Sequence, residues 1–560
     1  MNSYQTIYRA LEEVAHGFTL TQPEDALHGD FATNIAFIVG KEKGLSPQEA
    51  AKELVVSFAE KLKDSVEKIE VAGPGFINFF LKDDVRTDEA EGVALSDVMN
   101  IKTGKKVIVE YTDPNPFKLF HIGHLVPNTI GESVARIYES AGYDVTRVCY
   151  QGDVGMHVAT TLWGVKHGGE HMPEESASLR DKVAYLGRAY AYGTQKLADD
   201  ANVKQEIATI NKAVFTRSDD VINKEYDLGR KWSLDYFETL YKKLGTTFDY
   251  YIFESEVGEE GVRIVKENLG TVFEESDGAI VYKGEQDGLH TRVFINSQGL
   301  PTYEGKELGN TYKKESLVPG AEISVVVTAK EIDEYFKVIQ AVLKKIDKPL
   351  GDRLIHMSHG MLRLPEGKMS SRKGNIIPTE ELIDMVSERI TSRMGDIKVS
   401  EEDKAQLVND IAVGAIKFSI LKSAPGKDMI FDFEKSLSFE GDSGPYLQYT
   451  HARLCALLNK ADEAGIDIES YSVESPERAL EQVIIGYTET LEKAYKDLGP
   501  HHIVQHLLLL TRAFNNMYSR VQIIGEDKEA SAYYVMLSQA TKNILAHGLY
   551  TLGIKAPTKM

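Results

Sequence analysis

Two short segments of the sequence carry residue types suited to chemistry on a nucleotide. His121-Ile-Gly-His124 places two histidines around a glycine, and Lys368-Met-Ser-Ser-Arg372 is basic and rich in hydroxyls. Imidazoles can donate to phosphate oxygens without a permanent charge, and a lysine offsets the charge that develops when an α-phosphate is attacked. Gly123 would let a flat ring or a ribose approach the backbone. We therefore expect the two segments to grip a nucleoside triphosphate from two sides, with Lys368 and Ser370 on a closing loop.

Each segment alone has a more ordinary interpretation. Two histidines near a helix start are more often a hydrogen-bonded cap, and a cluster of basic residues is more often a solvated loop. The pairing of both patterns, in this order, at the ends of strands favours a nucleotide site. The sequence contains no glycine-rich phosphate loop of the form G-x-x-x-x-G-K-[ST] that would provide a different one.

The elements around the first segment predict a parallel sheet. A short β-branched strand at 107–111, a helix that ends at Gly142 and a second strand at 145–150 form a strand–helix–strand unit. In such sheets ligands bind beyond the carboxyl ends of the strands, which is where the histidines lie. Further strands are expected at 292–296, at 323–328 and from Leu354 towards the basic segment.

The chain of 560 residues is too long for one hydrophobic core. We expect an α/β fold of three parts: an N-terminal α/β module at 1–95, a Rossmann-like parallel-sheet domain at 106–395 and an α-helical bundle at 400–560. A charged stretch at about 173–244 has helical character and is expected as an insertion in the sheet domain.

Composition limits the class of protein and its location. No apolar run approaches the roughly 20 residues needed to cross a bilayer, so we expect a cytoplasmic protein without a membrane partner. Cys149 and Cys455 offer neither zinc spacing nor a disulfide framework, and no bound metal or permanent organic cofactor is expected. The net charge of −21 argues against indiscriminate binding to nucleic acid but leaves a specific RNA partner open.

The two segments and their sheet resemble the class I aminoacyl-tRNA synthetases, whose HIGH signature matches 121–124 and whose KMSKS loop matches 368–372. More narrowly, the chain resembles the arginyl family along nearly its whole length. The supporting segments are 29–34, 73–79, 110–124, 152–155, 302–308, 444–453 and 552–560. The resemblance implies activation of L-arginine by ATP and transfer to tRNA-Arg, with ATP and Mg²⁺ entering as substrate. A monomer is expected.

The resemblance also implies roles for particular residues. The implied catalytic residues are His121, His124 and Lys368, and the implied ATP ligands are Lys118, Gly123, Ser370 and Ser371. Glu110 and Asn115 match residues that hold the α-amino and carboxylate groups of arginine. Tyr303 and Glu307 would bind the guanidinium, a planar cation that needs a carboxylate and an aromatic wall. Without the resemblance, Tyr303 would be read as core and Glu307 as a solvated helix position.

The sequence departs from the family pattern at several positions. Glu307 and Lys306 stand where the family usually has Asp and Arg, which keeps the charges but moves the carboxylate by about 1.5 Å. His157 replaces a frequent glutamine, and no contact is assigned to it. Ser371 replaces the second lysine of KMSKS, and Lys118, just upstream of HIGH, is expected to compensate as a phosphate ligand.

The C-terminal part resembles the anticodon-binding domain of this family, and the N-terminal module resembles its additional domain that contacts tRNA. Side chains suited to RNA in the C-terminal part are Tyr446, Tyr449, Arg453, Phe514, Asn515, Tyr518 and Arg520. Phe514 and Tyr518, spaced i,i+4, are more often core residues. Two alternatives stay open: a class I synthetase for another amino acid, and a catalytically silent synthetase-like protein that binds RNA.

Overall fold

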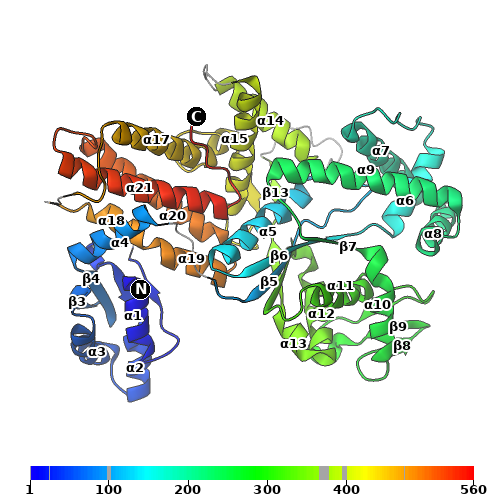
Figure 1. The fold of residues 1–560 in the computed structure, drawn as a ribbon. Coiled ribbons are helices and arrows are strands. Elements are labelled where there is room, and N and C mark those ends of the chain that lie inside the picture. The colour runs from blue at the N-terminus through cyan, green and yellow to red at the C-terminus, as the bar shows by residue number, and fades with distance from the viewer. Residues whose placement is uncertain are drawn as a thin grey trace. The chain divides into compact units, whose positions relative to one another are not determined.

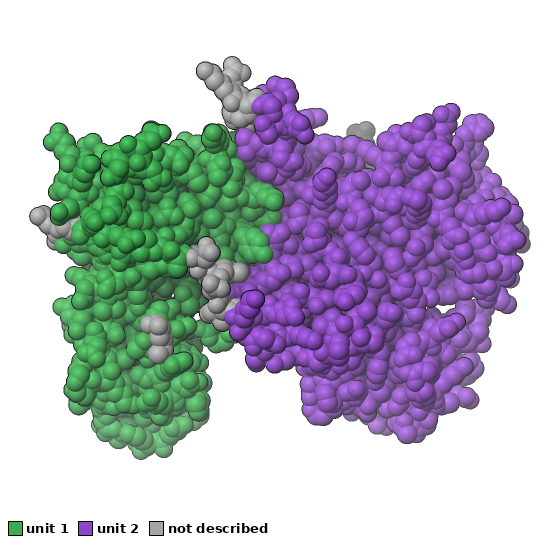
Figure 2. All heavy atoms as spheres, in the orientation of Figure 1, with its two compact units in different colours: residues 1–100, 438–560 green, residues 101–437 purple. Residues whose placement is uncertain are grey.

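The computed structural model describes residues 2–23, 26–96, 102–364, 377–393, 400–471, 473 and 475–560. The chain divides into two compact units (Figures 1 and 2). Unit 1 is built from residues 1–100 together with 438–560, and unit 2 from residues 101–437. Segments from the two ends of the sequence therefore belong to one unit.

Unit 2 is built on a five-stranded parallel sheet. Its order is β12-β11-β5-β6-β7, and every neighbouring pair runs parallel. The strands are β5 (Lys106–Glu110), β6 (Asp144–Gln151), β7 (Tyr250–Phe253), β11 (Ile323–Ala329) and β12 (Leu354–His359). The β-branched run of β5 is buried on both faces, as expected of a central strand covered by helices. The predicted parallel-sheet α/β fold is confirmed.

Helices connect the strands of this sheet (Figure 1). The first, α5 (Ile122–Ser140), joins β5 to β6, so the predicted strand–helix–strand unit is present. Four helices interrupt the sheet between β6 and β7: α6 (Met156–His167), α7 (Leu179–Asp199), α8 (Ala201–Thr216) and α9 (Asp220–Leu244). The side chains of Ser178, Asp200 and Asp219 cap the last three, which favours helix in this charged stretch.

The elements after β7 complete unit 2. The strand expected at 292–296 belongs to a small antiparallel sheet of β8 (Glu274–Ser276), β9 (Ala279–Tyr282) and β10 (Arg292–Ile295). The helices are α10 (Glu254–Glu267), α11 (Tyr303–Leu317), α12 (Asp333–Ile346), α13 (Lys348–Arg353), α14 (Thr379–Arg393), α15 (Glu401–Leu421) and α16 (Phe433–Ser436). Two short strands, β13 (Leu362–Arg363) and β14 (Met429–Ile430), pair with each other. Within this unit α10 packs against α11, and α15 packs against α14.

Unit 1 combines a sheet module with C-terminal helices. The sheet is antiparallel in the order β1-β2-β4-β3, with β1 (Leu20–Thr21), β2 (Phe31–Thr33), β3 (Val66–Ala72) and β4 (Phe76–Leu81). The module's helices are α1 (Ser3–Glu12), α2 (Ile35–Lys43), α3 (Pro47–Lys61) and α4 (Asp83–Leu95). The C-terminal helices are α17 (Gly444–Glu463), α18 (Arg478–Ile485), α19 (Tyr487–Lys496), α20 (Pro500–Arg520) and α21 (Lys528–Thr551).

A buried ion network joins the two parts of unit 1. Arg86 of α4 is fully buried, and its Nε donates to Glu481 of α18 at 3.0 Å. Glu481 also accepts from the hydroxyls of Thr87 and Tyr533, each at 2.8 Å. Removing one partner of such a pair leaves a buried charge uncompensated, which costs about 3–5 kcal/mol. The module and the helices are therefore strongly coupled.

Candidate active site

The loop between β5 and α5 follows an unusual backbone path. Thr112, Asp113 and Phe117 have positive φ angles of 82°, 42° and 68°, a region that L-residues rarely adopt. The Tyr150 amide donates to the Asp113 carboxylate at 2.8 Å. The Phe117 amide donates to the Ser233 hydroxyl at 2.9 Å. Backbone strain of this kind persists where the surroundings impose it, and it clusters at functional sites.

The two predicted histidines lie at the start of α5 with their rings stacked. His121 is the N-cap residue, and its Nδ1 accepts from the Gly123 amide at 3.0 Å. His124 Nδ1 accepts from the His121 amide at 3.3 Å, and the two ring centroids are 4.0 Å apart. Because both Nδ1 atoms accept, each neutral ring carries its proton on Nε2, and that nitrogen can donate to a ligand.

Gly123 is required by this arrangement. A Cβ at position 123 would lie 2.7 Å from His121 Cε1 and 2.8 Å from His121 Nδ1, closer than real side chains come. The glycine thus makes room for an imidazole of its own helix start, besides leaving an exposed stretch of backbone for a ligand.

Burial and the charge of Lys118 keep both histidines neutral. Burial, together with the charge of the Lys118 ammonium, lowers the pKa of His121 to about 4. Burial also lowers the pKa of His124 well below its usual value, with contributions from His121 and Lys118. The Lys118 ammonium lies 5.2 Å from the ring centroid of Tyr190. The structure therefore brings Lys118, His121 and His124 together.

The chain beyond the basic segment runs beside the histidines. The Ile122 amide donates to the Ile377 carbonyl at 3.1 Å, and the Thr379 amide donates to the Phe120 carbonyl at 3.0 Å. Residue 377, where the described chain resumes, is therefore next to the start of α5. The predicted residues Lys368, Ser370 and Ser371 lie outside the described residues.

A second set of predicted residues forms a buried acidic cluster at the end of β5. Glu110 and Glu307 are 1% and 4% exposed. The Asn310 amide group donates to Glu110 at 3.0 Å and to Glu307 at 3.2 Å. The buried Lys314 ammonium donates to Glu110 at 2.6 Å. Glu307 is thus a buried residue, not a solvated helix position, and it shares its surroundings with Glu110.

The charges of this cluster do not cancel. Burial, followed by repulsion from Glu110, raises the pKa of Glu307 to about 7, against the opposing effect of Lys314. Burial also raises the pKa of Asp113 well above its usual range, and the Glu110 charge adds to this shift. When Glu307 is ionised, the carboxylates of Glu110 and Glu307 face the single ammonium of Lys314. The cluster then carries one net negative charge.

An exposed aromatic ring lies on the same helix as Glu307. Tyr303, the first residue of α11, is 64% exposed and is not a core residue. The Lys306 ammonium lies 4.6 Å from the Tyr303 ring centroid and forms a buried ion pair with Glu254. An exposed aromatic ring near a buried acidic cluster suits a planar organic cation.

The remaining predicted residue, Asn115, lies against the chain just beyond β6. A Cβ on Gly152 would lie 2.4 Å from Asn115 Oδ1 and 3.3 Å from Glu254 Oε1. His157 is engaged nearby, since its Nε2 lies 2.9 Å from the Gly152 carbonyl oxygen. Burial lowers the pKa of His157 to about 3, helped by the Lys118 charge, so this ring is neutral as well.

Three residues of this site, Asn310, Lys314 and Glu254, were not predicted from the sequence. Asn310 and Lys314 follow Glu307 by three and seven positions, the spacing of one helix face, so the periodicity of α11 could have indicated them. Glu254 directly follows β7. The one feature that could have indicated Glu254 as a site residue is its position just beyond the carboxyl end of a parallel strand.

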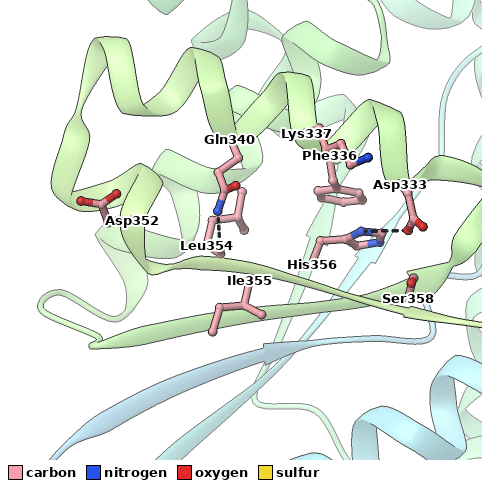
Figure 3. A pocket seen from close by; sticks show the side chains of 9 residues that line it. All are labelled: Asp333, Phe336, Lys337, Gln340, Asp352, Leu354, Ile355, His356 and Ser358. Atoms are coloured by element: carbon pink, nitrogen blue, oxygen red, sulfur yellow. Dashed lines mark hydrogen bonds and ion pairs between the residues drawn. The ribbon is translucent and has the colours of Figure 1, made fainter. Parts of the chain in front are cut away.

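A separate pocket of about 430 Å³ lies beside the edge strand β12 and helix α12 (Figure 3). Within it His356 stacks on Phe336, with ring centroids 4.1 Å apart, and His356 Nδ1 lies 3.5 Å from Asp333. None of the described residues that line this pocket is a predicted site residue. The candidate active site is instead the set of side chains at the ends of β5, β6 and β7.

In unit 1, helices α17 and α20 carry the aromatic and cationic residues considered for RNA. Phe514 is buried and belongs to the core, whereas Tyr449 is 43% exposed. The exposed Arg453 guanidinium lies 4.1 Å from the ring centroid of the half-buried Tyr518. An arginine stacked on a tyrosine in this way can extend to an unpaired base.

Models of known families match the chain in three stretches. The model for tRNA synthetases class I (R), catalytic domain, matches residues 92–433. The model for the arginyl tRNA synthetase N terminal domain matches residues 4–81, and the DALR anticodon binding domain matches residues 447–560.

Individual proteins agree with these matches. The arginine–tRNA ligase of Amoebophilus asiaticus is 31% identical to this chain over 81% of both proteins. That of Streptococcus suis is 30% identical over 99% of this chain and 98% of its own. The Thermus thermophilus arginyl-tRNA synthetase has the same fold with a TM-score of 0.82 at 24% identity, covering 100% of this chain and 99% of its own. The Plasmodium falciparum enzyme has a TM-score of 0.77 at 20% identity, covering 99% and 97%.

In the described ranges, no helix is long and apolar enough to cross a membrane. The catalytic-domain model alone spans more than half of the sequence, and it includes the histidine pair, the acidic cluster and the parallel sheet. The resemblance seen in the sequence is confirmed: the chain belongs to the class I arginyl-tRNA synthetase family.

Proposed function

We propose that this chain ligates L-arginine to tRNA-Arg through an arginyl-adenylate formed from ATP. One observation carries the proposal at the level of the site: two buried carboxylates, Glu110 and Glu307, share one cluster with a single lysine ammonium. A guanidinium is a permanent, planar cation and would complete that balance. The stacked histidines at the same sheet edge provide the nucleotide side of the reaction.

At the arginine end, Glu307 supplies the counter-charge and Tyr303 the aromatic face. Glu110 strengthens the negative potential, while Lys314 holds its carboxylate at 2.6 Å and limits the excess to one charge. A buried carboxylate that lacks its cation is costly, so the pocket favours a ligand that brings one. Uncharged amino acids of similar size would leave Glu307 uncompensated or protonated.

At the ATP end, His121 and His124 would donate from Nε2 to phosphate oxygens. The arginine carboxylate attacks the α-phosphate, an acyl–phosphate bond forms, and pyrophosphate leaves with the β- and γ-phosphates. Donors already fixed in place stabilise the charge that develops, and low histidine pKa values keep them neutral before ATP arrives. ATP enters as its Mg²⁺ complex. Gly123, Lys368, Ser370 and Ser371 complete the proposed phosphate and nucleoside contacts.

Lys118 takes the part of the missing second lysine of the basic segment. Its support is that the Lys118 ammonium lies close enough for its charge to lower the pKa of both His121 and His124. A lysine at that place supplies the positive charge that Ser371 lacks.

The two parts of unit 1 would bind tRNA-Arg. The exposed side chains of α17 and α20, among them Tyr449 and Arg453, support anticodon binding by the C-terminal helices. The N-terminal module would contact the tRNA elsewhere. We further propose that the chain acts as a monomer in the cytoplasm, where translation uses its product.

The decisive experiment charges a purified tRNA-Arg transcript with labelled arginine against a panel of other amino acids. Arginine should be attached to the exclusion of the rest. Attachment of a different amino acid would favour a synthetase of other specificity. If no adenylate forms with any amino acid while tRNA still binds, the chain is a silent RNA-binding relative.

A further inference from the structure

Arginine carries a second cation, its α-ammonium, and this group must be held while the neighbouring carboxylate attacks ATP. Glu110 is poorly placed for that task because it lies in the cluster with Glu307. Its Oε2 atom accepts from Lys314 at 2.6 Å and from Asn310 at 3.0 Å, which ties the carboxylate to the Glu307 cluster. Because the resemblance implies that Asn115 holds this end of arginine, a further acceptor for the α-ammonium should lie close to Asn115.

Glu254 lies where such an acceptor is needed. It is the first residue of α10, directly beyond the carboxyl end of β7, and it is 6% exposed. One carboxylate oxygen, Oε2, pairs with the buried Lys306. The other, Oε1, and Asn115 Oδ1 both lie within 3.3 Å of the place that a Cβ on Gly152 would take. Two acceptor oxygens thus meet beside a residue that has no side chain to separate them.

The charge of Glu254 reaches the arginine pocket. Burial is the main cause of the raised pKa values of Tyr303 and Glu307, and the charge of Glu254 adds to both shifts. Lys306, which Glu254 holds, directly precedes Glu307 on α11. Glu254 therefore lies near both Glu307 and Asn115.

We propose that Glu254 Oε1 and Asn115 Oδ1 together accept hydrogen bonds from the α-ammonium of the bound amino acid. This inference rests on the proposed function and deepens it, because it separates two cation sites in one pocket. The Glu307 end recognises the side chain, and the Glu254 end recognises the α-amino group. Glu254 is then a substrate-binding residue and not solely the ion-pair partner of Lys306.

The test compares two ligands on the full-length protein. Arginine has the α-ammonium, and 5-guanidinopentanoate is the same molecule without it. Dissociation constants are measured by calorimetry for the wild type and for Glu254→Gln, with a thermal melt of each variant. We expect Glu254→Gln to weaken arginine about 10- to 100-fold, the effect of losing a charged hydrogen-bond partner, and to leave 5-guanidinopentanoate within about twofold.

Two matched variants separate the role of Glu254 from those of its neighbours. Glu307→Gln should weaken both ligands by the same factor, because both carry the guanidinium. Lys306→Gln breaks the ion pair from the other side but keeps the Glu254 carboxylate, so it should not weaken arginine relative to 5-guanidinopentanoate. If Lys306→Gln reproduces the selective loss, Glu254 acts through Lys306 and the proposal is wrong.

Equal weakening of both ligands by Glu254→Gln, or weakening of neither, also overturns the proposal. Should that variant fail to fold, Gly152→Ala gives an independent test, because its Cβ would displace both acceptor oxygens and should again penalise arginine selectively. Failure of the proposed function looks different: the wild type itself would then neither bind nor activate arginine.

Discussion

Affinity for arginine should depend on pH through Glu307. In the empty pocket this carboxyl group has its pKa raised to about 7, first by burial and then by Glu110. Arginine binds the ionised form, because the guanidinium needs a counter-charge. Protonation of Glu307 below pH 7 therefore competes with binding, and arginine binding in that range must expel a proton.

The size of the effect follows from the pKa. About 90% of the empty pockets hold an ionised Glu307 at pH 8, and about 10% do so at pH 6, so affinity should fall about tenfold between these values. The histidine pair does not interfere, since the pKa of His121 is lowered to about 4. The difference of about tenfold corresponds to about 1.4 kcal/mol of binding free energy.

Calorimetry tests this directly. The dissociation constant for arginine is measured from pH 6 to pH 8 in buffers of different ionisation enthalpy, which also counts the protons released. 5-Guanidinopentanoate serves as a second ligand without an α-amine that titrates, and Glu307→Gln serves as the protein control. An affinity that stays constant over this range, or a Glu307→Gln variant that keeps the wild-type slope, would refute the reasoning.

Three further substitutions have defined outcomes. Gly123→Ala should displace the His121 ring from the amide of residue 123 and lower the rate of adenylate formation more than tenfold, with the melting temperature almost unchanged. Unchanged turnover would show that the position of the ring is unimportant. His124→Ala should lower the rate of arginine-dependent pyrophosphate exchange about 10²-fold or more, as for other removed charge-stabilising donors, and full activity would reject the site. Lys314→Met should destabilise the fold by about 3–5 kcal/mol in urea unfolding, because Glu110 loses its buried partner, and a wild-type midpoint would contradict the pairing.

The local parts of the site were predictable from the sequence. The β-branched run before the histidines and the apolar spacing after them define a strand and a helix, and the histidines fall at the helix start. The burial of Glu307 and its shared surroundings with Glu110 were not predictable, because the hydrogen bond from Asn310 to Glu110, 200 positions away, leaves no mark in local spacing. The sequence shows a glutamate at position 110 but does not show which residues surround it in the fold. Lys368 and its hydroxyl companions stay a prediction.

The structural reason for a glycine at position 123 was also not predictable from the sequence. From the sequence, Gly123 was expected to leave room for a ligand, whereas in the structure the His121 ring occupies the space that a side chain at position 123 would need. Which side chain of a pair points back towards the chain depends on rotamers set by tertiary packing. Unit 1 is built from two distant stretches of sequence, and this too was not predictable, because the composition of neither stretch indicates that it packs against the other.

That division has a consequence for synthesis on the ribosome. The N-terminal module emerges first, but Glu481, which neutralises Arg86 in the finished fold, emerges only after all of unit 2. At about 5–20 residues per second the delay is on the order of half a minute. Throughout that interval the Arg86 guanidinium has only Asp83 and Asp30 of its own module as partners, and the face of α4 that packs against α18 stays uncovered. In chains truncated before residue 438, proteases and chaperones should therefore recognise the N-terminal module.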